Sequence, residues 1–444
     1  MKKCDVVVVG GSAAGITAAL TARRHYPYRT VTLIRKEEKV LIPCGIPYIF
    51  GTVGGTDKNL IPDGVLSDNG INLVINEVSS INCKEKTLLL SSGETTSYNK
   101  LVLATGSEPL KLPIPGLDKK DVFFVKKDIH YLKSLLKRLG SVRNVVVLGG
   151  GFIGVEFADE FKKKGMNVTI VEMLPRCLML AFEEELCKEA ENKLTNRGVN
   201  IITGTKIEEI LGEDTVTAVR LSDGRELKAD IVLVGVGVKP NTNLAEEAGL
   251  DVNRGGIVVD STMKTSDENI FACGDCATKR SFFTGKPSGL RLASIAAIEA
   301  RIAGANLSKI HRNNPGAVGV FSTAIGDLVL ATAGMTEKTA KEDGFVVSCG
   351  YAEAPDRHPG GMPGMNQMKV KLVFNKETKE ILGGQAMGGP SAGEVVNTIS
   401  ACIQNRMKAD DIAVFQIGTH PAVTASPIAY PMVNAAEMAN IMMK

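Results

Sequence analysis

Two stretches of the chain repeat the same order of apolar, glycine and helical positions. Each begins with an uninterrupted apolar run, as expected of a strand buried on both faces of a sheet. A glycine turn, a helical pattern and a second β-rich run follow in both copies. The repeat predicts two βαβ units, each of a kind that binds a dinucleotide. The paired segments are residues 6–9 and 145–148 (first strand), 16–24 and 155–164 (helix), and 30–34 and 167–171 (second strand).

The glycine motifs stop at about Gly316, and a mixed pattern follows. Residues 368–374 predict a strand there, and residues 392–406 predict an amphipathic helix. We therefore predict an α/β protein with two Rossmann-like dinucleotide-binding domains and a C-terminal α+β domain. The predicted bounds are 1–112 and 241–316 for the first, discontinuous domain, 113–240 for the second, and 317–444 for the third.

Composition narrows the class of protein. The 444 residues include 52 basic and 49 acidic side chains, and no basic run indicates a nucleic-acid partner. Nine scattered cysteines do not resemble a secreted disulfide scaffold. The first apolar run contains Asp5 and ends in glycine, so it predicts a strand and not a signal peptide. No apolar run approaches the ~20 residues that span a bilayer. We expect a cytoplasmic protein without a membrane partner.

The glycine turn of the second repeat is Gly149-x-Gly151-x-x-Gly154. The first glycine permits the tight turn, the second lets a pyrophosphate approach the backbone, and the third lets helix and strand pack closely. Glu172 ends the next strand, at the position of the carboxylate that binds a ribose 2′-hydroxyl and repels a 2′-phosphate. The pattern predicts a site for NADH, with NADPH as the less favoured alternative.

The first repeat departs from this pattern at two positions. Its motif residues are Gly10, Ser12 and Gly15, so serine replaces the middle glycine and its hydroxyl can donate to a phosphate. Arg35 stands where the ribose-binding carboxylate is expected, and Glu37 and Glu38 follow slightly later. The usual carboxylate–ribose contact is therefore either missing here or made by a displaced glutamate.

Three further segments carry a family resemblance. Ile270–Asp275 ends in Gly-Asp, Thr105-Gly106 follows an apolar run, and residues 230–240 form a second run that contains Gly237. In this order they resemble the FAD-dependent pyridine nucleotide–disulfide oxidoreductases over nearly the whole chain. The resemblance implies FAD on the first domain, with Asp275 at the ribityl or phosphate region and Thr105 and Gly106 at the crossover. It also implies NAD(P)H on the second domain and a homodimer formed through the third.

The same resemblance interprets Cys273-x-x-Cys276. By itself this spacing suits a redox pair or half of a zinc site. Both cysteines flank the Gly-Asp motif, and no second Cys/His pair lies near them in the sequence. We interpret them as part of the flavin motif and predict no metal site.

Cys44 is the predicted reactive cysteine. It lies in the Pro- and Gly-containing turn Pro43–Tyr48. Family members similar to glutathione reductase carry Cys-x-x-x-x-Cys here, whereas this chain has Ile49 at the second position. A single cysteine must cycle as a thiolate against a mixed disulfide, persulfide or sulfenic acid. This resembles the single-cysteine branch of coenzyme A disulfide reductases, NAD(P)H persulfide or polysulfide reductases, and NADH peroxidases and oxidases.

Other positions bear on the choice within that branch. Ala13 stands where the oxidases and peroxidases carry a histidine, which weakens oxygen or peroxide reduction as the main activity. Arg23 and Arg24 fit the basic residues that hold CoA phosphates, and fit a solvated helix end equally well. The stretches around His358 and His420 lack the tyrosines of coenzyme A disulfide reductases, so CoA specificity stays open.

His420-Pro421 resembles a motif whose histidine is the acid–base group that reaches across the dimer. The glutamate that normally orients this histidine is replaced by Ala425. We predict Cys44 and His420 as the catalytic pair, with His358 as the second candidate for the proton.

The predicted reaction passes electrons from NADH through FAD to Cys44 and reduces a low-molecular-weight disulfide, persulfide or polysulfide. A CoA-containing substrate is one option. The alternatives are an NADH oxidase or peroxidase, and a flavin-binding sensor in which oxidation of Cys44 changes a protein partner.

Overall fold

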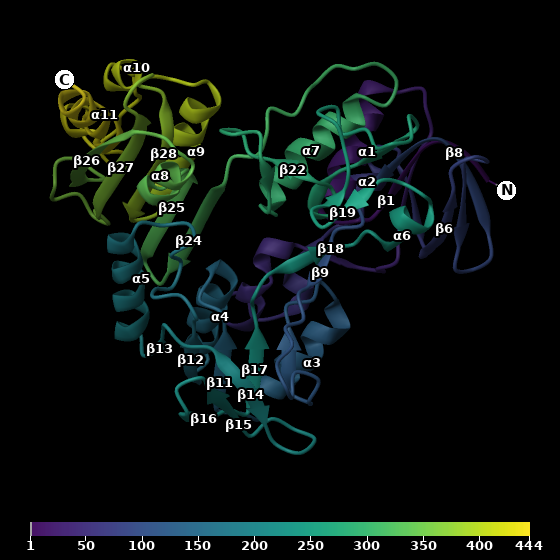
Figure 1. Cartoon of the computed structure of the whole chain (residues 1–444), viewed down its shortest axis with the longest axis horizontal. Coiled ribbons are helices and arrows are strands. Elements are labelled where there is room, and N and C mark those ends of the chain that lie inside the picture. Colours follow the sequence, from purple (N-terminus) through teal and green to yellow (C-terminus); the bar gives the residue numbers. More distant parts are fainter. Residues whose placement is uncertain (1) are drawn as a thin grey trace. The chain divides into compact units, whose positions relative to one another are not determined.

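The computed structural model describes residues 2–444, which fold into two compact units (Figure 1). The α/β class is confirmed. The division into three domains stays a prediction. Among residues 2–444, each helix is too short or too polar to cross a membrane. Unit 1 comprises the residues up to Leu112, Phe124–Ser141 and Val236–Ala317, and unit 2 comprises Pro113–Phe123, Val142–Gly235 and Val318–Lys444.

Unit 1 is built on a seven-stranded sheet in the order β5-β2-β1-β8-β7-β6, with β21 paired to β8. The central strand β1 is parallel to β2 and β8, and its residues Val6–Val8 are fully buried, as its apolar run predicts. The carboxyl ends of these strands therefore meet at one edge, where open α/β sheets bind ligands. The strands are β1 (Lys2–Val9), β2 (Val31–Arg35), β5 (Asn72–Ile75), β6 (Val78–Asn82), β7 (Thr87–Leu90), β8 (Thr95–Leu103) and β21 (Ile270–Ala272).

Two helices of unit 1 pack against each other closely because both carry small side chains. In α1, Ala18 and Ala22 are fully buried, and a side chain at Gly304 of α7 would collide with the carbonyl oxygen of Ala18. The helices of unit 1 are α1 (Ala13–His25), α2 (Gly64–Ser67), α3 (Ile129–Leu139), α6 (Asn243–Glu247) and α7 (Ala293–Ala305). Its short strand pairs are β3 (Val40–Leu41) with β4 (Leu60–Ile61), β9 (Ser107–Pro109) with β18 (Val238–Pro240), β19 (Val252–Asn253) with β20 (Gly256–Ile257), and β22 (Lys279–Arg280) with β23 (Pro287–Ser288).

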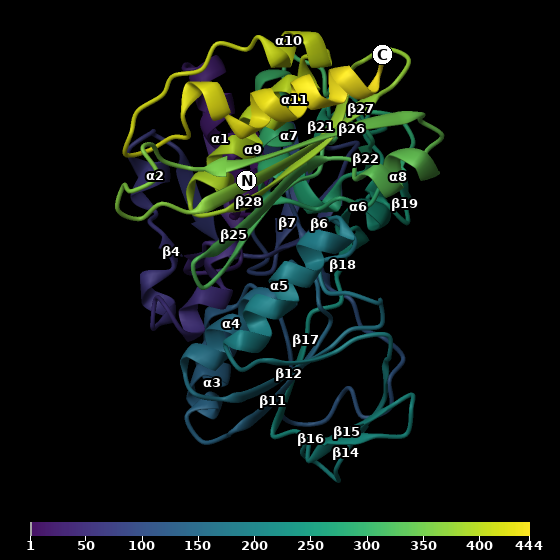
Figure 2. The same ribbon diagram turned by 90° about the vertical axis from the view of Figure 1, so that its left-hand side faces the viewer.

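Unit 2 contains the second βαβ unit. Its sheet has the order β10-β17-β11-β12-β13, and β11 is parallel to both β12 and β17. A small antiparallel sheet, β14-β15-β16, lies beyond the lower end of this sheet in Figure 2. The strands are β10 (Val122–Phe124), β11 (Asn144–Leu148), β12 (Asn167–Val171), β13 (Asn200–Ile202), β14 (Ile207–Leu211), β15 (Ala218–Leu221), β16 (Glu226–Lys228) and β17 (Ile231–Val234).

The C-terminal part of unit 2 is an antiparallel sheet in the order β24-β25-β28-β27-β26. Helix α9 packs on β25 and β28, and α11 packs on β26 and β27. The strands are β24 (Val320–Ile325), β25 (Leu328–Gly334), β26 (Val347–Pro355), β27 (Gln367–Asn375) and β28 (Ile381–Gly388). The helices of unit 2 are α4 (Phe152–Lys163), α5 (Glu184–Asn196), α8 (Glu337–Glu342), α9 (Ser391–Gln404), α10 (Ala409–Ala413) and α11 (Pro431–Met442).

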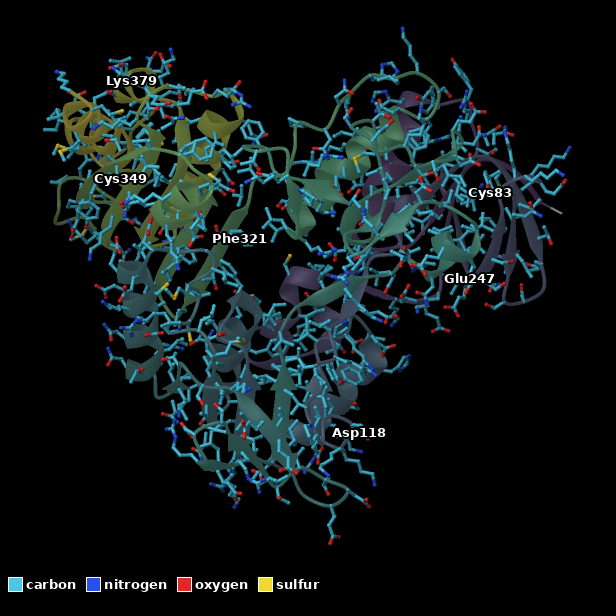
Figure 3. All side chains as sticks on the ribbon, viewed as in Figure 1. Cys83, Asp118, Glu247, Phe321, Cys349 and Lys379 are labelled. Carbon is cyan, nitrogen blue, oxygen red and sulfur yellow. The ribbon has the colours of Figure 1, made fainter. Side chains whose placement is uncertain are left out.

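Strand β24 joins the two parts of unit 2. Phe321, labelled in Figure 3, stacks on Phe152 at the start of α4, with ring centroids 4.8 Å apart. Thr323 donates a hydrogen bond of 3.1 Å to Glu156, one turn further along α4. The dinucleotide-binding helix therefore packs directly against the C-terminal sheet.

Candidate active site

Both glycine turns have the geometry that their spacing predicts. Gly10 and Gly149 adopt φ angles of +114° and +106°, which glycine reaches without strain. A side chain on Gly15 would collide with the carbonyl oxygen of Gly10, and one on Gly154 would collide with that of Gly149. The third glycine of each motif thus lets the helix start against the turn.

The second turn is open where a pyrophosphate approaches. A side chain built on Gly151 would meet nothing within 4 Å. The carboxylate of Glu172 accepts hydrogen bonds from the backbone N–H groups of Gly150, at 2.6 Å, and Leu174, at 2.8 Å. Glu172 thus stands at the predicted position and also holds the glycine turn and the turn after β12. Its role as ribose ligand stays a prediction.

The crossover residues of unit 1 lie together. Thr105 donates its hydroxyl to the carbonyl oxygen of Asn241 at 2.8 Å, and the Asn241 side chain returns a bond to the carbonyl oxygen of Thr105. Gly106 has a φ angle of +72° and accepts from the Asn241 N–H. Gly237 accepts a bond from the Leu110 N–H. The two predicted crossovers therefore meet through β9 and β18.

Asp275 follows β21 at the same sheet edge as Gly10. One of its carboxylate oxygens accepts from the Ser107 hydroxyl at 2.7 Å and from Lys127 at 3.4 Å. Arg291 donates to its backbone carbonyl. The carboxylate is thereby held at a sheet edge that the sequence motif assigns to flavin.

A buried ion pair below this motif was missed by sequence reasoning. Lys279 and Glu299 lie 3.2 Å apart, with side chains 2 % and 1 % exposed. Lys279 also donates to the carbonyl oxygen of Gly274, and Glu299 accepts from the Gly274 N–H. The pair fixes the backbone of the Gly-Asp motif from both sides. No local signal in the sequence links residues 279 and 299.

The cysteines differ sharply in exposure. Among residues 2–444, Cys44 is the one exposed cysteine, and Cys83 and Cys349, labelled in Figure 3, are half-buried. Burial raises the thiol pKa of seven others, and for Cys187 and Cys349 the value rises to about 12. These seven are Cys83, Cys177, Cys187, Cys273, Cys276, Cys349 and Cys402. Burial therefore disfavours the thiolate at each of them.

Cys44 lies in a short 3₁₀ turn, Pro43–Gly45, that the buried side chain of Asn59 supports from below. Asn59 donates to the carbonyl oxygen of Ile42, and a side chain on Gly45 would collide with Asn59. The predicted rigid turn is therefore present, and Asn59 is a supporting residue that sequence reasoning missed.

Two loops of unit 2 bring the candidate histidines together. The His358 N–H donates to the carbonyl oxygen of Pro421, and the His358 ring nitrogen Nδ1 lies 3.1 Å from that of Thr424. His420 is exposed, and its Nδ1 accepts a bond from the Ala422 N–H at 3.2 Å. In a neutral His420 the proton then lies on Nε2. A backbone N–H thus orients this ring, which Ala425 cannot do.

Glu156 is a further titratable group that sequence reasoning missed. It lies on α4, two residues after Gly154. Burial raises the pKa of Glu156 to about 7, against the opposing effect of the Thr323 hydrogen bond. A carboxyl group that titrates near neutral pH therefore stands one turn from the N-terminus of the dinucleotide-binding helix.

Two family models match the chain. Residues 4–300 match the pyridine nucleotide-disulphide oxidoreductases, and residues 320–428 match the dimerisation domain of the same family. The chain belongs to this family. It is an oxidoreductase that uses FAD and NAD(P)H, and the resemblance seen in its sequence is confirmed.

Individual relatives cover most of the chain. The NAD(P)H coenzyme A polysulfide/persulfide reductase of Pyrococcus horikoshii is 33% identical over 87% of this chain and 88% of its own. An NADH oxidase of Methanocaldococcus jannaschii is 30% identical over 97% of each chain. The structure of an NAD-dependent persulfide reductase from A. fulgidus has a TM-score of 0.91 and 30% identity, and it covers 99% of this chain and 83% of its own.

The residues of both glycine turns fit the family's dinucleotides. In unit 1, the hydroxyl of Ser12 at the start of α1 makes no capping bond, so it can donate to a phosphate. In unit 2, the space over Gly151 leaves room for a pyrophosphate.

Proposed function

We propose that this protein is an NAD(P)H-dependent reductase that uses Cys44 to cleave the sulfur–sulfur bond of a small disulfide, persulfide or polysulfide. The observation that carries the proposal is the exposure of Cys44 on a supported turn, while burial raises the pKa of seven other thiols. The persulfide reductase names of the Pyrococcus and A. fulgidus relatives support the same substrate class.

Bound FAD supplies two electrons that it takes from NAD(P)H as a hydride. The Cys44 thiolate attacks one sulfur of the substrate R–S–S–R′, forms a Cys44–S–S–R bond and releases R′S⁻. Two electrons and one proton then cleave this mixed disulfide to the Cys44 thiolate and RSH. A persulfide R–S–SH attacked at its outer sulfur gives RS⁻ and, after the same reduction, HS⁻.

His420 is the proposed proton donor to the departing thiolate. Its proton-bearing Nε2 follows from the bond that Nδ1 accepts from Ala422, and His358 lies in the adjoining loop. Both histidines lie in the segment that matches the family's dimerisation domain. We therefore place His420 at the Cys44 of the second subunit in a homodimer with shared sites.

A CoA-containing substrate is the finer part of the proposal. The Pyrococcus relative is named for coenzyme A. Of the two arginines considered for CoA phosphates, Arg23 donates to the backbone carbonyls of Pro27 and Arg29 and so closes the turn after α1. Arg24 is exposed at the same helix end and is the remaining candidate.

Reduction of oxygen is the second candidate function, because the Methanocaldococcus relative is named an NADH oxidase. Ala13 at the start of α1 carries no acid–base group, so this loop cannot supply a proton to a sulfenic acid on Cys44. We therefore rank sulfur reduction first.

The test is anaerobic oxidation of NADH by the FAD-loaded protein with CoA disulfide, CoA persulfide, polysulfide, oxygen or peroxide as acceptor. Cys44→Ser should lower sulfur reduction by about 10³-fold or more, because a hydroxyl neither attacks nor forms a disulfide at neutral pH. NADH should still reduce the bound flavin. Cys83→Ser, which changes a half-buried thiol, is the matched control and should retain activity. Full sulfur reduction by Cys44→Ser would refute the proposal.

A further inference from the structure

Arg35 and Glu172 occupy the same place in the two βαβ units. The Gly10 N–H donates to the carbonyl oxygen of Ile34, and the Gly149 N–H donates to that of Val171. The residue after this anchor is Arg35 in unit 1 and Glu172 in unit 2. The side chain of Arg35 is only 1 % exposed, so its guanidinium does not extend toward solvent or toward an incoming phosphate.

The two side chains hold their turns with opposite polarity. Glu172 accepts bonds from backbone N–H groups. Arg35 instead donates to the backbone carbonyls of Glu37, at 2.8 Å, and Glu38, at 2.9 Å, and its charge is balanced by Asp63 at 2.7 Å. Arg35 thus closes the turn after β2 with a planar fork of donors, which lysine could not reproduce.

This exchange changes what the glycine turn offers to a ligand. In unit 2 the Gly150 N–H is already bound by Glu172. In unit 1 the Gly11 N–H has no acceptor among residues 2–444, although Gly11 is buried and the alkyl stem of Arg35 lies against it. A buried N–H without an acceptor is rare and costs free energy until a partner arrives.

The closed turn also holds a carboxylate. Glu37 is half-buried, and its carboxylate makes no hydrogen bond or ion pair within residues 2–444, whereas Glu38 is exposed. A ribose presents hydroxyl groups that both donate and accept, so it needs an acceptor as well as a donor. The turn contains one of each.

We propose that unit 1 holds the adenosine ribose of FAD by the Gly11 N–H as donor and the Glu37 carboxylate as acceptor, with Arg35 as the positioning residue that sets the turn. The inference rests on FAD binding to unit 1, and it is independent of the chemistry proposed for Cys44. Arg35 acts through the backbone of the turn and does not touch the cofactor.

The test measures binding to the flavin-free protein, by quenching of flavin fluorescence, with FAD and with FMN. FMN has the same isoalloxazine, ribityl chain and phosphate as FAD but no adenosine. Glu37→Gln should weaken FAD binding about 10-fold and leave FMN binding unchanged, whereas the matched control Glu38→Gln should change neither. Arg35→Gln should weaken FAD binding by about 10-fold or more, again without an effect on FMN.

Binding of NAD⁺ to unit 2 checks that each variant is folded. Equal FAD affinity in Glu37→Gln, Glu38→Gln and the unmodified protein would overturn the inference. Parallel losses of FAD and FMN would also overturn it, because they would show no contact specific to adenosine. Tighter FAD binding by Arg35→Glu would show that an ordinary carboxylate serves better there. An unmodified flavin-free protein that binds no FAD would remove the cofactor assignment and this inference with it, whatever Cys44 does.

Discussion

The two βαβ units share a backbone plan and differ in the side chains that complete it. In both, the first glycine of the turn has a positive φ angle and the third packs against it. At the end of the second strand, however, Arg35 donates to carbonyl groups and Glu172 accepts from N–H groups. Two residues after the third glycine, α4 has the carboxyl group of Glu156 where α1 has Thr17.

This difference shows which parts of such a unit are interchangeable. The turn and helix start are set by steric limits that only glycine meets, so they recur in both copies. The position after the second strand only has to hold the adjoining turn, and a donor or an acceptor can do so. Chemical specificity therefore lies at that position and along the helix.

The largest expected effect comes from the shared part. Gly15→Val and Gly154→Val each place a branched side chain against the carbonyl oxygen of the first glycine. We expect Gly15→Val to weaken FAD binding by about 10³-fold with NAD⁺ binding retained, and Gly154→Val to do the reverse. Isothermal titration of both ligands into both variants measures this. A variant that loses both ligands equally would contradict independent sites.

The next effect tests how the two units divide the chemistry. His420→Ala should lower sulfur-substrate turnover by about 10²-fold, the range for losing a general acid–base group. Flavin reduction by NADH should be nearly unaffected in stopped-flow measurements, because hydride transfer needs no proton from His420. His130→Ala, in α3 of unit 1, is the control.

Mixed dimers sharpen the same prediction. Hybrids of Cys44→Ser and His420→Ala subunits should recover part of the activity, because one of their two sites is complete. Demonstrated hybrids without recovery would exclude the shared site. Full activity of His420→Ala alone would transfer the proton to His358 or to solvent.

A smaller effect concerns the acceptor of unit 2. Glu172→Ala removes the bonds to the Gly150 and Leu174 N–H groups and the charge that repels a 2′-phosphate. We expect the preference for NADH over NADPH, measured as the ratio of kcat/KM values, to fall about 10-fold. Glu172→Gln keeps an acceptor oxygen and should retain more of the NADH affinity. An unmodified enzyme that uses both cofactors equally would show that Glu172 does not contact the ribose.

The smallest effect is a pH dependence confined to unit 2. The folded state raises the pKa of Glu156 from 4.5 to about 7, so it favours the protonated carboxyl group. The stability that this group contributes is complete below about pH 4.5 and is lost as the pH rises through about 7. Glu156→Gln should therefore stabilise the protein by about 1–3 kcal/mol at pH 8 and by almost nothing at pH 4.5.

Calorimetric Tm values of the unmodified protein and Glu156→Gln at the two pH values measure this effect. Glu247→Gln, which changes an exposed carboxylate of unit 1, is the control and should not alter the pH dependence. An equal Tm change at both pH values would show that burial of the charge is not the cause.

Local patterns in the sequence determined the repeated part of this protein. Apolar runs and glycine spacing predicted both βαβ units, because burial on two faces and a positive φ angle act over a few neighbouring residues. The helix predicted over 16–24 begins earlier, at Ala13, because Ser12 is already the N-cap. The strand predicted over 167–171 has the same bounds in the structure. Cys44 was singled out by its turn, and its exposure agrees with that choice.

Only the tertiary structure decided which groups these elements bring together. Asp63 meets Arg35 across 28 residues, Glu299 meets Lys279 below the Gly-Asp motif, and Thr323 meets Glu156 across 167 residues. Such contacts depend on which strand ends and helices the topology makes neighbours, and no local periodicity encodes that. The same holds for burial, which raises the pKa of Glu156 only after β24 packs against α4.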